Sequence, residues 1–235
     1  MKYQLLTWDT KFFEIQTGRI IPTSLQENQL ASILTEMRQK GFQLVYWASD
    51  HQYTYDFQSY SGILVDKKTT FEINLQNINL DSMPLPKTEP YSNSLPFSKL
   101  EKLAVQSGAF SRFTRDNKFP HEKFTALYET WIRKSVSGEM ANEVLVIRQN
   151  NHIVGMVTLS NKNGVGDIGL ISVDEEFRGR KFGQQLVCDA QRWFIQNGCH
   201  TAHVVTQGDN LPACRLYEKC GYQKIKIEFF YHFWL

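Results

Sequence analysis

The residues of this chain best suited to chemistry form a basic loop in the C-terminal half. RGRKFG, residues 178–183, follows a strand-like run that ends at Val173 and begins a helical pattern. The first amides of a helix have no intrahelical acceptor and lie at the positive end of the helix dipole, so they favour a pyrophosphate. The loop adds the cations Arg178, Arg180 and Lys181, and the glycines Gly179 and Gly183, where a ligand backbone can approach closely. Alone, the loop also permits an ordinary helix cap or another phosphate-binding site.

A second unit, GDNLPACRLYEKCGY, follows at residues 208–222. Together the two units resemble the GCN5-related N-acetyltransferase (GNAT) superfamily, whose motifs are V-x-x-x-x-R-G-x-x-x-G and N-x-x-A-x-x-x-Y-x-x-x-G-Y/F. The matching residues are Val173, Arg178, Gly179 and Gly183, then Asn210, Ala213, Tyr217, Gly221 and Tyr222. The superfamily usually has a further glycine at the position of Lys181, and we expect this lysine to adopt a helical conformation.

The resemblance implies that acetyl-CoA is the co-substrate and that no metal is needed. The strand ending at Val173 would splay from its neighbour and free backbone groups for the pantetheine arm, and an N–H near Val173 would polarise the thioester carbonyl. The Asn210 side chain would bond the pantetheine; a helix N-cap is its alternative role. The implied coenzyme contacts are Ile171, Ser172, Val173, Arg178, Gly179, Arg180, Lys181, Phe182, Gly183, Gln184, Asn210 and Ala213.

The resemblance also implies catalytic roles. Tyr217 is expected to act as the general acid, because a phenol of pKa ~10 can protonate a departing thiolate of pKa ~8.5; a core position is the alternative for this tyrosine. Asp167 occupies the position of a glutamate in many relatives, and it is the candidate base, working through water because its side chain is short. A solvated strand-end carboxylate is the alternative for Asp167.

Much of the chain further resembles the nucleotide-sugar N-acetyltransferases typified by TDP-fucosamine acetyltransferases, through residues 6–20, 61–75 and 107–138. Those enzymes acetylate the 4-amino group of a dTDP-linked 4-amino-4,6-dideoxygalactose for cell-surface polysaccharide synthesis. The likeness implies that Arg112 or Arg115 pairs with the nucleotide diphosphate. It also implies that Asp66 or Glu72 binds the sugar amine or hydroxyls. For each of these residues an ordinary surface position is the alternative.

Hydrophobic periodicity indicates the elements that must position these residues. Helical patterns occur at 24–41, 121–138, 183–197 and 211–219, and strand-like patterns at 42–48, 69–75, 142–149, 152–160, 166–173, 201–206 and 222–231. Short turns rich in Asn and Gly join the three runs between 142 and 173, which favours an antiparallel meander. The apolar C-terminus, IKIEFFYHFWL, is either a closing strand or part of a homodimer contact, and we favour the strand.

A proline-rich segment divides the chain. Residues 81–98 hold four of the seven prolines, which excludes a continuing helix or a central strand there. We therefore predict an acceptor-side domain at 1–80, a linker at 81–98 and a catalytic domain at 99–235. The predicted fold class is α/β (α+β), a mixed, mostly antiparallel twisted sheet flanked by helices, as the GNAT resemblance implies, with a partial GNAT-like N-terminal domain.

Composition excludes other classes of protein. The 26 basic residues nearly balance the 24 acidic ones, which argues against nucleic-acid binding. We find no signal peptide and no apolar run of ~18 residues, so we expect no membrane span. The four cysteines have no zinc-like spacing, which agrees with a cytoplasmic location. The open alternatives are a GNAT acting on another small amine or a protein N-terminus, and a coenzyme A-binding sensor without turnover.

Overall fold

A computed structural model describes residues 1–235. The strands are β1 (Tyr3–Leu5), β2 (Thr17–Ile20), β3 (Leu44–Ser49), β4 (Gly62–Asn74), β5 (Glu89–Pro90), β6 (Glu143–Gln149), β7 (His152–Lys162), β8 (Val165–Val173), β9 (Thr201–Gln207) and β10 (Gln223–Trp234). The α-helices are α1 (Thr7–Phe13), α2 (Glu27–Gln39), α3 (Phe97–Ser107), α4 (Arg112–Arg115), α5 (His121–Val136), α6 (Phe182–Gln196) and α7 (Leu211–Lys219).

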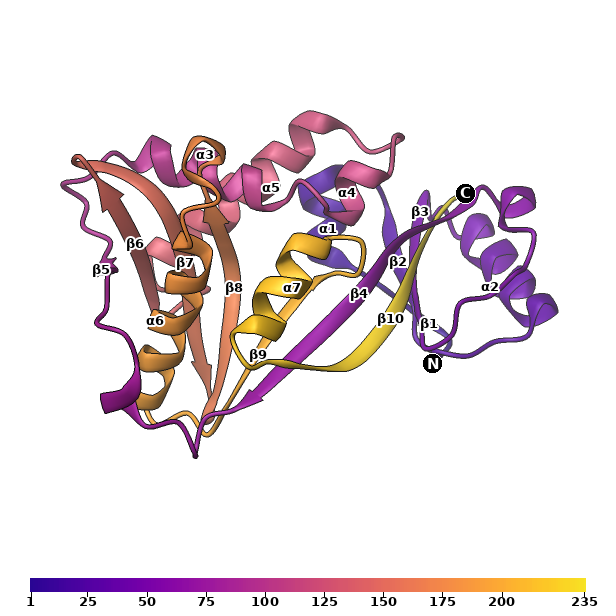
Figure 1. Cartoon of the computed structure of the whole chain (residues 1–235). Coiled ribbons are helices and arrows are strands. Elements are labelled where there is room, and N and C mark those ends of the chain that lie inside the picture. The colour runs from indigo at the N-terminus through magenta and orange to yellow at the C-terminus, as the bar shows by residue number, and fades with distance from the viewer.

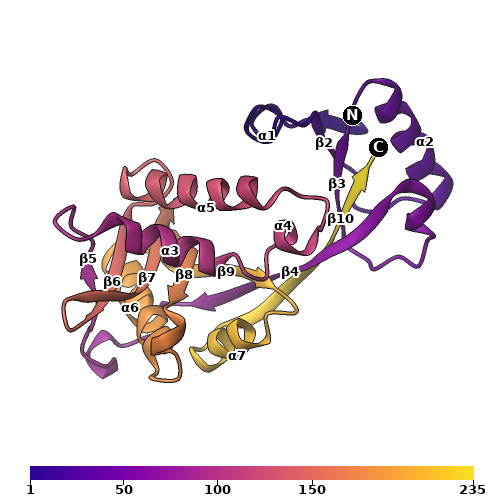
Figure 2. The same cartoon turned by 90° about the horizontal axis from the view of Figure 1, so that it is seen from above.

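All ten strands form one sheet, in the order β1-β2-β3-β10-β4-β9-β8-β7-β6-β5. Neighbouring strands are antiparallel except for β2 with β3 and β8 with β9. Figures 1 and 2 show α2 at one end of the sheet and α3, α5 and α6 at the other, with α7 between them. The mixed, mostly antiparallel sheet flanked by helices confirms the predicted fold class.

Helices cover both faces of the C-terminal half of the sheet. Leu186 and Phe194 of α6 pack with Val204 of β9 on one face, and Leu100 of α3 and Phe124 of α5 pack on the other face. Each of these side chains is at most 3% exposed. The strands between the two layers are therefore held rigidly, and they position the residues of the site.

The C-terminal segment forms a strand, as predicted. β10 lies between β3 and β4, where its Tyr231 and Phe233 pack with Trp47 in the core beneath α2. The last residues of the chain thus complete the sheet of the N-terminal unit. β4, from the same N-terminal unit, pairs with β9 in turn, so the sheet is continuous across the predicted boundary.

The predicted helices correspond to α2, α5, α6 and α7, whereas α1, α3 and the four-residue α4 were not anticipated. α1 has only seven residues and no side-chain cap, too few for a clear periodicity. α3 begins directly after Pro96, at the end of the segment that we assigned to the linker. Proline is tolerated at a helix start, so the prolines of that segment did not exclude a helix immediately after it.

Candidate active site

An open strand edge lies between β8 and β9. The two strands pair only as far as Ile168 and Val204, although β8 continues to Val173 and β9 to Gln207. Beyond Ile168 the backbone of β8 has no neighbouring strand on that side. The splay expected near Val173 is therefore present.

A β-bulge lies where the two strands separate. Gly169 and Leu170 of β8 both stand opposite Thr158 of β7, and Thr158 Oγ1 accepts the N–H of Leu170 at 2.8 Å. An extra residue bends its strand and increases the local twist. The bulge thus turns the end of β8 away from β9.

The backbone groups on this open edge are those of Ile171 and Val173. The N–H of Asp174 donates to the carbonyl of Val154 in β7 at 2.8 Å. Hydrogen-bonded and non-bonded positions alternate in an antiparallel ladder, so the N–H and C=O groups of Ile171 and Val173 point away from β7. They face the side that β9 has left, where they can pair with an extended amide-containing ligand.

The basic loop ends at an uncapped helix start. No side chain caps the N-terminus of α6, and its first turn contains no acidic residue. Cations are unfavourable at the positive end of a helix dipole unless an anion is bound. The exposed side chains of Arg178, Arg180 and Lys181 therefore place three cations beside the first amides of α6, and residues 178–183 are called the anion loop below.

The backbone at Lys181 differs from our expectation. Its φ is +64°, in the left-handed region, whereas we expected a right-handed helical conformation. The left-handed region is the one that glycine adopts readily, which explains why the superfamily usually has glycine there. Lys181 adopts it as the residue that precedes the first turn of α6.

The two glycines of the loop have different surroundings. Gly179 has a φ of +76°, and a Cβ atom placed on it would meet nothing within 4 Å, so the space beside it is open to a ligand. A Cβ atom on Gly183 would lie 3.3 Å from Cδ2 of Leu216 in α7. Gly183 therefore serves the packing of α6 on α7, and the close ligand approach that we expected there stays a prediction.

α7 carries the second predicted unit. Asn210 is the N-cap of α7, and the Oδ1 atom of Asn210 accepts the N–H of Ala213 at 3.3 Å. Asn210 therefore has the capping role, and its side-chain Nδ2 remains free to donate to a ligand. Tyr217 is 2% exposed and packs against Phe71 and Tyr222. Burial raises the pKa of the Tyr217 phenol above its usual value, which keeps it protonated at neutral pH. Leu216, its neighbour, contacts the start of α6, so the structure brings this tyrosine's helix next to the anion loop.

The structure places Asp167, the predicted base, and Glu72 away from the predicted acceptor residues Arg112, Arg115 and Asp66. Asp167 lies in the paired half of β8, opposite His203 of β9, and its carboxylate is 3.1 Å from Lys162 Nζ. Glu72 lies on the other side of His203, with 2.6 Å between its Oε2 and the imidazole Nε2. These side chains form a polar row across β8, β9 and β4, on the far side of the bulge from Val173.

Arg112, Arg115 and Asp66 lie together beside the end of β9. Arg115 Nη1 is 2.7 Å from Asp209 Oδ2, one residue before Asn210. Asp66 is half-buried, and this burial raises its pKa to about 7 although Arg112 and Arg115 lower it. The cluster is thus a cationic surface around a carboxyl group that titrates near neutrality.

Arg112 is held by aromatic rings. Its guanidinium carbon is 4.3 Å from the ring centroid of Tyr46, 4.6 Å from that of Phe113 and 5.1 Å from that of Phe230. No carboxylate lies within 4 Å of it, and it makes no side-chain hydrogen bond. Cation–π contacts orient a guanidinium without neutralising it. Arg112 is therefore a positioned cation without an ion-pair partner within 4 Å, although its charge acts on the nearby carboxyl groups of Asp66 and Asp9.

A buried hydrogen-bonded pair, His232 and Asp116, supports the ring of Tyr46. His232 Nδ1 lies 2.7 Å from Asp116 Oδ2, both side chains are fully buried, and the rings of His232 and Tyr46 are 4.7 Å apart. Burial lowers the pKa of His232 to about 4, against the opposing effect of Asp116. His232 is therefore neutral at pH 7 and donates its Nδ1–H to Asp116. Its Nε2 and the Tyr46 hydroxyl are buried without a hydrogen-bond partner.

A pocket of about 360 Å³ adjoins Arg112 between α1, α4 and α5. Its lining is mainly aromatic and apolar, with Trp8, Asp9, Phe13, Arg112, Phe113, Leu127, Thr130, Trp131, Lys134 and Met140. A Cβ atom on Gly169 would lie 3.8 Å from Trp131 Nε1. Trp131 thus connects this pocket to the bulge where the open edge of β8 begins.

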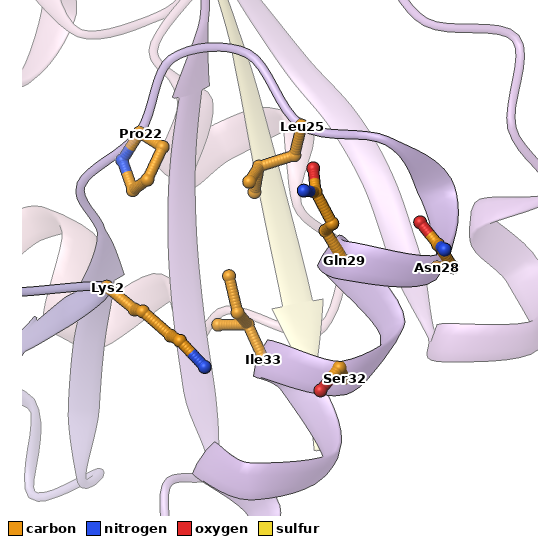
Figure 3. A pocket seen from close by; sticks show the side chains of 7 residues that line it. All are labelled: Lys2, Pro22, Leu25, Asn28, Gln29, Ser32 and Ile33. Carbon is orange, nitrogen blue, oxygen red and sulfur yellow. The ribbon is translucent and has the colours of Figure 1, made fainter.

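Another hollow, of about 470 Å³, lies on the N-terminal unit. Figure 3 shows Lys2 and Pro22 on one side of it and Asn28, Gln29, Ser32 and Ile33 of α2 on the other. It holds neither a carboxylate nor a nucleophilic group aligned with a base. We therefore do not place the chemistry there.

Three contributors to the site were not identified from the sequence. Asp9 and Trp131 line the pocket beside Arg112, and Gln106 contacts the end of β8. Asp9 of α1 and Trp131 of α5 are 122 positions apart in the sequence. Only the fold brings these two residues together. No cluster of His, Cys, Asp and Glu suitable for a metal is present. No helix has the length and apolarity needed to cross a membrane.

Comparison with known proteins agrees with this geometry. A sequence model described as the acetyltransferase (GNAT) family matches residues 105–222, a range that contains the open edge of β8, the anion loop and α7. The spore coat polysaccharide biosynthesis protein SpsD of Bacillus subtilis (strain 168) is 23% identical over 133 residues, 57% of this chain and 46% of that protein. The streptothricin acetyltransferase of Escherichia coli is 30% identical over 82 residues, 34% of this chain and 47% of that protein. The chain thus matches about half the length of each of these relatives.

Solved structures show the same architecture. A GCN5-related N-acetyltransferase from Sphaerobacter thermophilus aligns with a TM-score of 0.61 and 15% identity, over 98% of this chain and 75% of that one. A functionally unknown conserved protein from Staphylococcus epidermidis ATCC 12228 aligns with a TM-score of 0.66 and 13% identity, over 98% of this chain and 89% of that one. At these identities the likeness concerns the fold alone.

Proposed function

We propose, from the premise that this chain belongs to the acetyltransferase (GNAT) family, that it transfers the acetyl group of acetyl-CoA to a primary amine. The observation that carries this proposal is the open edge of β8, which ends directly before an uncapped helix start with three cations. An extended amide-containing arm followed by a pyrophosphate has the chemistry that matches these two features in this order. A nucleotide or phosphate module would need the cationic helix start and no open edge.

Different residues of the proposed coenzyme site would bind different parts of acetyl-CoA. The amides of residues 182–184 and the three cations of the loop would hold the pyrophosphate. The N–H groups of Ile171 and Val173 would pair with the pantetheine arm, and one of them would polarise the thioester carbonyl. The Asn210 side chain would bond the same arm from α7.

Tyr217 would supply the proton that the departing thiolate takes up. Because burial keeps the phenol protonated, the group is in the form that a general acid requires. A coenzyme A-binding sensor without turnover would have no need of a protonated tyrosine on the helix next to the anion loop. This position therefore favours an enzyme over a sensor.

Two carboxyl groups are candidates for the base that deprotonates the amine. Asp167 is paired with Lys162 and lies in the half of β8 that pairs with β9, away from the open edge. Asp66, with a pKa of about 7, is suited to accept a proton at neutral pH. We propose Asp66 as the base and retain Asp167 as the alternative, acting through water.

The acceptor that we propose is a nucleotide-linked amino-deoxy sugar, acetylated on its 4-amino group for cell-surface polysaccharide synthesis. Arg112 is a cation without an ion-pair partner within 4 Å and is suited to a diphosphate, and aromatic faces such as Trp8 and Trp131 suit a sugar or a base. The similarity to a polysaccharide biosynthesis protein supports this acceptor. The similarity to a streptothricin acetyltransferase supports the alternative, another small amine.

A thiol-release assay with acetyl-CoA tests the proposal. The acceptors to compare are TDP- and UDP-linked amino sugars, polyamines and peptides with a free N-terminus. We expect release with a TDP-linked 4-amino sugar. Release only with peptides or polyamines would reject the sugar acceptor and keep the acetyl transfer, and no release together with no binding of coenzyme A would reject both.

A further inference from the structure

We infer that Gln106 of α3 is a positioning residue for the coenzyme, because it replaces the missing neighbouring strand at the end of β8. The inference rests on the proposed function, which places the coenzyme arm along this edge. Gln106 lies outside both coenzyme motifs. Figure 2 shows α3 running beside β7 and β8.

The contact consists of two short hydrogen bonds from one side-chain amide. Gln106 Nε2 donates to Ser172 Oγ and to the carbonyl oxygen of Val173, each at 2.7 Å. The carbonyl of Val173 points away from β7, to the side where a paired β9 would have supplied an N–H. Gln106 supplies the shortest hydrogen bond to this carbonyl, at a partly buried position where β9 no longer offers a donor.

The same carbonyl oxygen also joins the edge to the anion loop. Arg178 Nε donates to Val173 O at 3.3 Å. One oxygen therefore connects α3, the end of β8 and the first cation of the loop. The position of Gln106 thus sets the distance between the two halves of the coenzyme site, the strand edge and the helix start.

This contact also determines which groups remain for the ligand. With the carbonyl of Val173 occupied, the open edge offers the N–H of Val173 together with the N–H and C=O of Ile171. Gln106 touches no reacting atom in this arrangement. Its contribution is to keep the edge apart from β9 and the free N–H groups directed into the opening.

Two substitutions test the inference. Gln106→Met keeps the length of the side chain and removes the donor, and Gln106→Glu places a carboxylate oxygen against a carbonyl oxygen. Ser98→Ala, an exposed position on the same helix, is the matched control. For each protein we would measure the Kd for coenzyme A by calorimetry, kcat, the KM values for acetyl-CoA and for the acceptor, and the Tm.

We expect both Gln106 variants to bind coenzyme A about tenfold more weakly, the loss typical of one backbone hydrogen bond at the upper end of its range. The KM for acetyl-CoA should rise, while the KM for the acceptor and the Tm stay near those of the control. Unchanged or tighter coenzyme binding in both variants would overturn the inference, as would equal changes in both KM values that follow a fall in Tm. If the unchanged protein binds no coenzyme A, the proposed function fails and this inference fails with it.

Discussion

Ile168 and Leu170 are two residues apart in β8, yet they pack on opposite faces of the sheet. Ile168 belongs to the core beneath α6, with Phe194, and Leu170 belongs to the core beneath α3 and α5, with Phe124. In a regular strand such residues share a face. The extra residue of the bulge beside Thr158 has therefore shifted the alternation of side chains between the two faces of the sheet. The same bulge lies where the pairing with β9 ends, and the opening of the proposed coenzyme site therefore follows from the local packing of β8.

Tyr217→Phe is expected to lower turnover by about 10²–10⁴-fold, the usual contribution of a general acid. The ring would keep its contacts with Phe71 and Tyr222, so the Kd for coenzyme A should stay the same. Steady-state thiol release and calorimetry would measure the two effects. Tyr222→Phe, which removes a buried hydroxyl without a partner, is the control; equal turnover in all three proteins would reject the acid role.

Asp66→Asn should change the stability of the protein in a pH-dependent way. The folded-state pKa of about 7 is above the usual 3.8, so the folded protein binds a proton that the unfolded chain releases between these values. The stability due to the protonated carboxyl is present at low pH and is lost as the pH rises through about 7. Asparagine cannot ionise, so the variant should gain stability relative to the unchanged protein at pH 8 and much less at pH 4.

Urea unfolding at both pH values would measure this difference. If Asp66 is also the base, kcat/KM should rise with pH through about 7, and Asp66→Asn should abolish most of the activity. A stability difference that is the same at pH 4 and pH 8 would contradict the raised pKa. Full activity of Asp66→Asn would reject Asp66 as the base and leave Asp167 as the candidate.

Arg112→Met should raise the KM for the acceptor by about 10- to 100-fold, because charge-assisted hydrogen bonds to a diphosphate are lost. The Kd for coenzyme A should not change. Arg133→Met is the matched control, since Arg133 lies in the last turn of α5, at the end of the helix that is distant from α4, and pairs with Glu101. An unaltered KM with a nucleotide sugar would show that Arg112 has no part in acceptor binding.

Lys181→Gly should raise the free energy of unfolding by about 0.5–1 kcal/mol, because the left-handed φ of +64° is strained for lysine and not for glycine. Lys181→Ala removes the same charge and keeps the strain, so it should bring no such gain. Urea unfolding of the two variants separates conformation from charge. Both should bind coenzyme A somewhat more weakly than the unchanged protein, since each loses one cation of the anion loop.

The sequence by itself determined the fold class, most of the elements and the two coenzyme motifs. These depend on residues close together in the chain: Arg178 and Gly179 at a helix start, Asn210 and Tyr217 on one short helix, and the periodicity of each strand. Such patterns are visible in the sequence because the backbone geometry that they specify is local. The local pattern failed at Lys181, where the conformation departs from the usual preference of its residue type.

Only the tertiary structure decided which residues meet. Asp66 and Glu72 are in one strand, yet Asp66 lies with Arg112 and Arg115, while Glu72 pairs with His203. Gln106 reaches Val173 across 67 positions, and the burial that raises the pKa of Asp66 comes from elements distant in sequence. Strand order, the bulge in β8 and burial are set by packing between such distant segments, and no spacing along the chain encodes them directly.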